Sequence, residues 1–273
     1  MVTAKALQRV VVRMLYDPAF VDSVYADAES ALVGVSLTGE ERTWLVAPDR
    51  RRWRADPLRR TRGLGALLEE YPVAGALLAR RDGVAALDAF FSTPSFHRCI
   101  QERGSLGLTF GRWLGGHPDP LLAGIAEMES AVAAVRRAGS RQIRWTVGQD
   151  YVMSPLVAVR LLPGGTMAAF AAIRGILTRG RDDLIAAVVD CALELGLHPI
   201  DPDDLEGLIV EAGSEVTMGD GPLGLIRVLM AAETPIDARA LGRAFIGEGA
   251  TLGEVPDLIA DLLQDGLLVA CPR

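Results

Sequence analysis

The stretch from Leu205 to Cys271 constrains the fold more than any other part of the chain, because it combines strand and helix signals in a fixed order. Residues 208–212 are β-prone, Gly213-Ser214 can turn, and residues 215–218 can return as a second strand. The glycines at 219 and 221 then end the strand, and three helical patterns follow. This order predicts a hairpin followed by a three-helix module over residues 205–273.

Five residues set the expected ends of these three helices. Pro222 suits the first turn of a helix, and Asp237 and Thr251 suit the N-caps of the next two. Glu254 stands three residues after Thr251, which is the capping-box spacing, and Gly266 can end the last helix.

One interpretation of this module is a winged-helix DNA-binding domain, whose recognition helix would enter the major groove. The last predicted helix contains no arginine or lysine, and its acidic residues are Glu254, Asp257, Asp261 and Asp265. Such a helix would repel a phosphate backbone. The sequence therefore argues against DNA binding through this helix.

A second interpretation is a peptide-docking module, in which an extended segment adds as a strand to the hairpin edge and packs against the last helix. A third is an accessory domain that only completes a core. The docking interpretation predicts peptide contacts in the hairpin and on the last helix, at Leu208, Ile209, Val210, Glu211, Val216, Met218, Leu258, Ile259 and Leu262.

Composition favours many short helices over a large sheet. Half of the 273 residues are hydrophobic, aromatics are scarce, and 29 glycines and 15 prolines interrupt the apolar segments. We therefore predict a mostly α-helical chain with α+β character. A helical N-terminal domain is expected over residues 1–139, and an α+β C-terminal domain over residues 140–273.

Helical spacing and capping patterns recur along the predicted N-terminal domain. Asp17-Pro18 should separate the first two helices, and Thr38 with Glu41 has capping-box spacing. The glycine-rich stretch 92–116 is expected to be a loop or connector. The large aromatic residues are expected to be core or inter-helix anchors: Trp44, Trp53, Tyr71, Phe90 and Phe91. Further on, strands are expected at 143–147 and 156–162, and helices at 120–137, 166–177 and 182–195.

No catalytic or metal-binding pattern stands out. The three cysteines and three histidines are scattered along the chain, and no Walker loop, dinucleotide fingerprint or nucleophile elbow occurs. We therefore expect no enzymatic activity, no metal and no cofactor, with the cysteines as buried thiols. No apolar run is long enough to cross a membrane and no signal peptide is recognised, so a cytoplasmic location without a membrane partner is expected.

Charge is divided unevenly along the chain. Residues 1–150 hold 20 of the 28 basic and 17 of the 35 acidic residues, a net charge of +3, whereas the other 8 basic and 18 acidic residues give residues 151–273 a net charge of −10. The arginines concentrate between residues 50 and 62. This cluster could bind nucleic acid, the acidic C-terminal half of the chain or an acidic partner, or it could be solvated. We predict that it binds protein carboxylates, and we assign partner contacts to Arg50, Arg51, Arg52, Arg59 and Arg60.

Several short motifs carry a family resemblance. They are Glu70-Tyr71-Pro72-Val73, Phe90-Phe91 with Pro94, Phe110-Gly111-Arg112-Trp113-Leu114, His117-Pro118, and the stretch from Ile125 to Ala131. In this order they resemble a bacterial family named for DNA binding, whose members accompany multinuclear non-heme iron oxidases, including those of methanobactin and 3-thiaglutamate biosynthesis. The resemblance extends over most of the chain.

The resemblance implies a non-catalytic partner subunit. Such a protein would form a heterodimer with the oxidase and help it engage a ribosomally made precursor peptide, and no nucleic acid partner is expected. A winged-helix transcription regulator that uses the arginines at 50–62 is the alternative, and a small-molecule enzyme is a third hypothesis.

Overall fold

A computed structural model describes residues 2–54, 56, 58–139, 150–178, 185–188, 190 and 200–271. Within these residues the protein is mostly α-helical and contains two three-stranded antiparallel sheets, which confirms the predicted fold class. The chain forms two compact units. We call residues 1–114 with 175–195 the N-terminal unit, and residues 115–174 with 196–273 the C-terminal unit.

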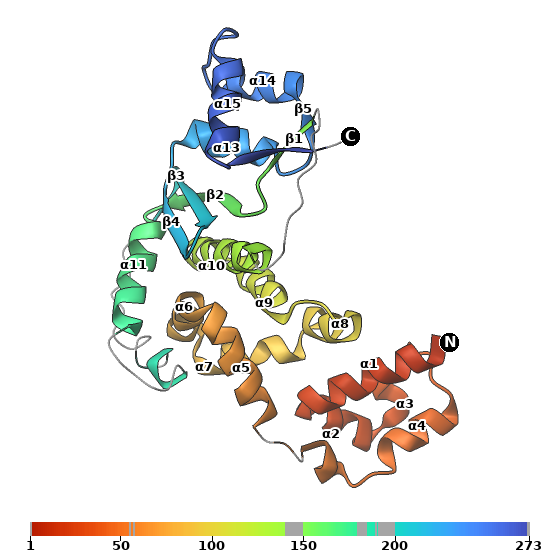
Figure 1. The fold of residues 1–273 in the computed structure, drawn as a ribbon. Coiled ribbons are helices and arrows are strands. Elements are labelled where there is room, and N and C mark those ends of the chain that lie inside the picture. The colour runs from red at the N-terminus through yellow and green to blue at the C-terminus, as the bar shows by residue number, and fades with distance from the viewer. Residues whose placement is uncertain are drawn as a thin grey trace. The chain divides into compact units, whose positions relative to one another are not determined.

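The N-terminal unit is built from short helices (Figure 1). Its described elements are α1 (Val2–Tyr16), α2 (Pro18–Ala26), α3 (Ala28–Ala31), α4 (Gly39–Val46), η1 (Arg50–Arg54), α5 (Arg59–Glu70), α6 (Pro72–Asp82), α7 (Val84–Ala89), η2 (Phe90–Ser92), α8 (Pro94–Glu102) and α9 (Leu106–Gly115).

Local capping chemistry fixes the first helices as predicted. Asp17 is the N-cap of α2 and accepts a hydrogen bond from the backbone N–H of Phe20 at 3.1 Å, with Pro18 at the first helical position. Thr38 and Glu41 form both hydrogen bonds of a capping box at the start of α4. These helix starts therefore follow directly from the sequence.

An aromatic cluster fills the centre of the N-terminal unit. Phe90 lies 5.4 Å from Phe96 and 5.0 Å from Phe110, in edge-to-face geometry, measured between ring centroids. Burial of Tyr71, Phe90 and Phe91 confirms three of the predicted anchors. Trp53 is half-buried and donates to the Tyr25 hydroxyl at 3.0 Å. The prediction is wrong for Trp44, whose side chain is 56% exposed on α4.

The glycine-rich stretch 92–116 is helical, which corrects its prediction as a loop. Thr93 caps α8, and the left-handed Arg103 ends it. In α9 the buried residues Gly107, Phe110, Gly111 and Leu114 lie on one helical face. Their spacing of three and four residues carries the helical signal, and the small glycines permit close packing.

The C-terminal unit combines helices with both sheets. Its described elements are α10 (Pro120–Gly139), β1 (Asp150–Met153), β2 (Val157–Gly164), α11 (Thr166–Leu177, which ends just beyond the unit boundary), β3 (Asp201–Ala212), β4 (Val216–Asp220), α13 (Leu223–Ala231), β5 (Ile236–Asp237), α14 (Ala238–Gly247), α15 (Val255–Gln264) and β6 (Leu268–Cys271).

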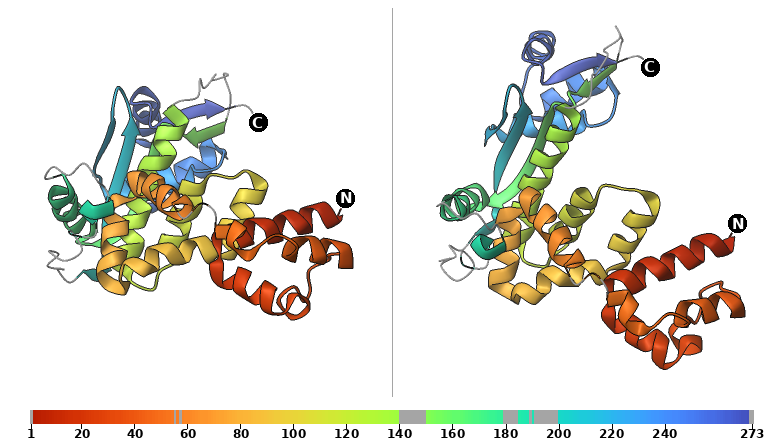
Figure 2. Two further views of the ribbon diagram at one scale, coloured as in Figure 1. Left: turned by 90° about the horizontal axis from the view of Figure 1, so that it is seen from below. Right: turned by 60° about the horizontal axis from the view of Figure 1, so that its bottom comes forward.

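The predicted hairpin is present and belongs to a sheet of order β2–β3–β4, which we call the hairpin sheet. Val210 of β3 pairs with Ala158 of β2 and with Met218 of β4. Helix α10 packs against all three strands, and Figure 2 shows it running beside β3. Because α10 packs on this sheet, it belongs to the C-terminal unit, and the structure divides the chain at residue 114 where the sequence suggested 139.

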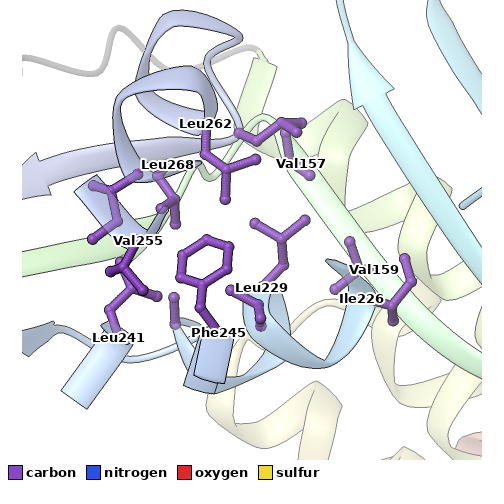
Figure 3. Close-up of a cluster of buried hydrophobic side chains, with 13 residues drawn as sticks. Val157, Val159, Ile226, Leu229, Leu241, Phe245, Val255, Leu262 and Leu268 are labelled. Atoms are coloured by element: carbon purple, nitrogen blue, oxygen red, sulfur yellow. The ribbon is translucent and has the colours of Figure 1, made fainter. Parts of the chain in front are cut away.

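The second sheet, of order β5–β1–β6, joins segments that are far apart in sequence, and we call it the module sheet. Its central strand β1 pairs Tyr151 with Ala270 of β6 and with Ile236 of β5. Helices α13, α14 and α15 share one apolar core with this sheet, in which the Phe245 ring lies among leucine and valine side chains (Figure 3). The three predicted helices are present, and two short strands that were not predicted, β5 between α13 and α14 and β6 after α15, join them to this sheet.

The structure confirms some of the predicted ends of the module helices. Asp237 caps α14 by accepting from the Ala240 N–H at 2.7 Å. Gly266 ends α15 with a φ of 72°, as predicted. The Glu254 carboxylate accepts a hydrogen bond from the Thr251 N–H at 2.8 Å, as the capping-box spacing predicted. Residues 251–254 nevertheless form a turn, and helix α15 begins only at Val255. The strand expected at 143–147, and most of the helix expected at 182–195, lie outside the described residues.

Candidate functional site

The β4 edge of the hairpin sheet is the strongest candidate site. Strand β3 is paired on both sides, whereas the edge strands β2 and β4 are each paired only with β3 among the described residues, and β4 is the edge that belongs to the predicted hairpin. Its five residues therefore present one row of backbone groups to a strand from outside. This is the edge that the docking interpretation requires.

Hydrogen-bond alternation shows which groups of β4 point inward. The Gly221 N–H donates to the Gly207 carbonyl at 2.9 Å, so that pair is hydrogen-bonded. In an antiparallel ladder every second pair exchanges such bonds, and the register therefore turns the backbone groups of Thr217 and Gly219 toward β3.

The alternate residues of β4 point their backbone groups outward. These are Val216, Met218 and Asp220. Two of the three, Val216 and Met218, belong to the predicted peptide site, while Asp220 was missed because the register cannot be read from the sequence alone.

The predicted hairpin residues divide between core and surface. Leu208 and Val210 are 0% exposed and lie on the sheet face covered by α10, where Arg160 of β2 donates to Glu127 of α10 at 3.0 Å. Ile209 lies on the other face and packs against the module core. These three side chains are packed in the core of the protein. The other predicted hairpin residues keep accessible surface: Glu211, Val216 and Met218.

The last helix does not face the open edge, which corrects the expected juxtaposition. Helix α13 packs on β2 and β3, whereas α15 packs on β6 and α14. Leu262 is buried and lies near Val157 of β2, at the opposite edge of the sheet from β4 (Figure 3). Leu258 is half-buried against the same core, and Ile259 is buried. A strand on β4 would therefore not reach these three residues.

A separate apolar groove lies between α14 and α15. It has a volume of about 660 Å³ and is lined by Ile259 together with Tyr151 of β1 and the exposed side chains of Ile246 and Leu252. Figure 1 shows α14 and β4 on opposite sides of α13. The groove is therefore a second surface, distinct from the β4 edge.

Most of the arginine cluster pairs with carboxylates of the N-terminal unit. Arg50 and Arg54 bind Asp22, and Arg60 lies 3.6 Å from Asp88. Arg59 and Arg62 both pair with Asp56, and Arg62 is the largest cause of the lowered pKa of that carboxyl. Three of the five arginines assigned to a partner, Arg50, Arg59 and Arg60, thus pair with carboxylates of their own unit, and contact with a partner stays a prediction. Among the described residues, the exposed Arg51 and Arg52 have no ion pair.

The residues capable of metal binding remain dispersed in the described parts of the chain. No group of three or more His, Cys, Asp or Glu side chains there could hold a metal ion. Cys99 is a buried free thiol and Cys271 is partly buried. Cys191 and His198 lie outside the described residues, so the absence of a metal site stays a prediction.

Two further findings bear on the type of protein. No helix among the described residues is long and apolar enough to cross a bilayer. No protein-family model and no curated protein sequence matches the chain.

Proposed function

We propose that this protein is the non-catalytic, cytoplasmic partner of a multinuclear non-heme iron oxidase and binds a ribosomally made precursor peptide for modification by that enzyme. The open edge of β4 is the observation that carries peptide binding. The oxidase and the heterodimer rest on the family resemblance of the motifs between residues 70 and 131.

Strand addition would use the outward backbone groups of Val216, Met218 and Asp220 for affinity. The side chains of a bound strand would alternate between the two faces of the hairpin sheet. On the α10 face they would lie beside Met218, and on the other face beside Thr217. Recognition through the backbone accepts varied peptide sequences, so specificity must come from these side-chain positions.

The arginine cluster is the surface we assign to the oxidase. Arg50, Arg59 and Arg60 are already held by acidic residues, whereas Arg51 and Arg52 are exposed and keep their five-donor guanidinium groups available within the described structure. Contact with oxidase carboxylates would therefore centre on Arg51 and Arg52.

The alternative of a winged-helix regulator draws support from the module topology and from the exposed Arg239 and Arg243 on α14. The acidic residues on α15 oppose it, because Asp257, Asp261 and Asp265 are all exposed. We expect no sequence-specific duplex binding at physiological salt. A footprint that disappears in the Arg239→Gln/Arg243→Gln variant would favour the regulator instead.

The genes beside this one provide the first test. We expect an adjacent iron oxidase gene and a short precursor gene, whereas a divergent promoter without either favours the regulator. The encoded precursor is then labelled and titrated against the wild type, Val216→Pro and Val216→Ala. The proline variant removes an outward N–H that the alanine variant keeps.

We expect at least about tenfold weaker binding for Val216→Pro and less than about threefold for Val216→Ala, from the loss of one main-chain hydrogen bond and disturbance of its neighbours. Unchanged affinity in a folded Val216→Pro protein would move the peptide away from β4. In that case the same titration with Leu252→Ser would test the groove between α14 and α15.

A further inference from the structure

A second potential binding site lies in the N-terminal unit, between α1, α2, the α3–α4 loop and α8. It is a pocket of about 800 Å³, a volume suited to a small organic ligand. Its wall includes Val10 and Phe20 on one side and Val35 on the loop, so it offers apolar contact area. Every lining residue belongs to one compact unit.

The charged residues of this pocket are all basic. Lys5, Arg9 and Arg13 follow one another at intervals of four residues and therefore lie along one face of α1. Arg98 joins them from α8. No acidic side chain lines the pocket, so a ligand with a positive charge would be repelled.

Only one of these four cations has a carboxylate partner among the described residues. Arg13 lies 3.4 Å from Asp17 and stacks 3.9 Å from the centre of the Phe20 ring. Arg9 donates to the neutral amide of Gln101 on α8 at 2.9 Å. Lys5 and Arg98 have no ion pair there, so three positive charges remain uncompensated.

His97 provides an independent indication of a ligand. Its side chain is only 8% exposed and lines the pocket, yet neither ring nitrogen has a hydrogen-bond partner in the structure as described. Buried polar atoms are normally hydrogen-bonded, so an orphaned imidazole beside a pocket requires an explanation.

The surroundings of His97 favour its neutral form. Burial is the largest cause of its lowered pKa, the charges of Arg13 and Arg60 lower it further, and Asp17 opposes them. A neutral imidazole has one N–H donor and one acceptor nitrogen. The N–H can donate to an oxyanion that the surrounding cations attract.

We propose that this pocket binds a small organic anion, with an apolar body against Phe20 and Val35 and an oxyanion held by Arg9, Arg98 and His97. The site is separate from strand addition at β4 and does not depend on it. Carboxylate and phosphate groups share the required chemistry, because both accept hydrogen bonds from guanidinium groups.

Calorimetry with isophthalate and phenyl phosphate distinguishes these two oxyanions. We expect saturable binding of at least one of them to the wild type, weakened at least about tenfold in Arg9→Gln/Arg98→Gln. Arg51→Gln/Arg52→Gln removes the same charge from exposed arginines outside the pocket and should change affinity less than about twofold. We expect the His97 ring signal, assigned through its loss in His97→Asn, to shift on binding in NMR spectra.

Three outcomes would overturn the proposal. The first is no saturable binding of either anion at millimolar concentration. The second is binding outside the pocket, shown by an equal loss of affinity in the two double variants or by a His97 signal that does not move. The third is binding of a glutamate-rich peptide with neither small anion bound, which would assign the pocket to a polypeptide.

Discussion

The two sheets of the C-terminal unit have the same number of strands but offer different opportunities to a partner. In the module sheet the edge strands are β5, with two residues, and β6, with four. In the hairpin sheet the edge strands are β4, with five residues, and β2, with eight, on the two sides of the twelve-residue β3. A short edge offers few backbone groups, so the capacity for strand addition lies in the hairpin sheet.

The sheets also differ in how they are held. The core of α13, α14 and α15 contacts the module sheet and one face of the hairpin sheet, whereas the other face of the hairpin sheet is covered by α10. We therefore assign structural support to the module sheet and propose the outer edge of β4 as the peptide-binding part. Three changes of decreasing effect test this difference.

The largest expected effect is in the module core. Phe245→Ala should lower the free energy of unfolding by about 3–5 kcal/mol, because it leaves a cavity among the leucines of that core. Its neighbour Ile246 is 44% exposed, and Ile246→Ala should change the stability by less than about 1 kcal/mol. Urea unfolding measures both. Similar losses in the two variants would contradict the assigned core.

The second effect separates the two sides of the hairpin. Val210 directs its backbone groups to Ala158 of β2, so Val210→Pro should cost about 3 kcal/mol or more in unfolding free energy. Val216 directs its groups outward, and Val216→Pro should cost less than about 1 kcal/mol. An equally large loss for Val216→Pro would mean that its N–H is needed within the fold.

The smallest effect concerns the junction of β5 and α14. Asp237 caps α14, so Asp237→Ala should lower the unfolding free energy by about 1 kcal/mol. Asp237→Asn keeps an accepting oxygen and should retain most of that stability. Peptide affinity should be unaffected in both, because β4 belongs to the other sheet. A loss of peptide binding in Asp237→Ala would show that a change beside the module sheet alters the β4 edge of the hairpin sheet.

Features with local causes could be predicted from the sequence. The hairpin, the Asp17, Thr38 and Asp237 caps and the glycine end of α15 each depend on a few adjacent residues. The core role of Tyr71 and the two adjacent phenylalanines also followed from their size. Helix α9 was missed because its glycines were taken as breakers, although their spacing places them on a buried face.

Features that depend on distant pairing could not be predicted. Strand β1 has only four residues, and it pairs Tyr151 with Ala270, which is far away in the sequence. The separation of α15 from the β4 edge likewise depends on tertiary packing. In contrast, the basic face of α1 was present in the sequence as Lys5, Arg9 and Arg13 at intervals of four, and that spacing could have indicated the pocket.

Amide hydrogen exchange followed by NMR tests the central claim most directly, because it reads the edge of β4 one residue at a time. On addition of the precursor peptide, we expect exchange to slow at Val216, Met218 or Asp220, whose N–H groups face outward. The amides of Thr217 and Gly219 are already bonded to β3 and should change little. Saturating peptide that leaves the outward amides unprotected, while it protects residues of α14 and α15, would contradict strand addition at β4.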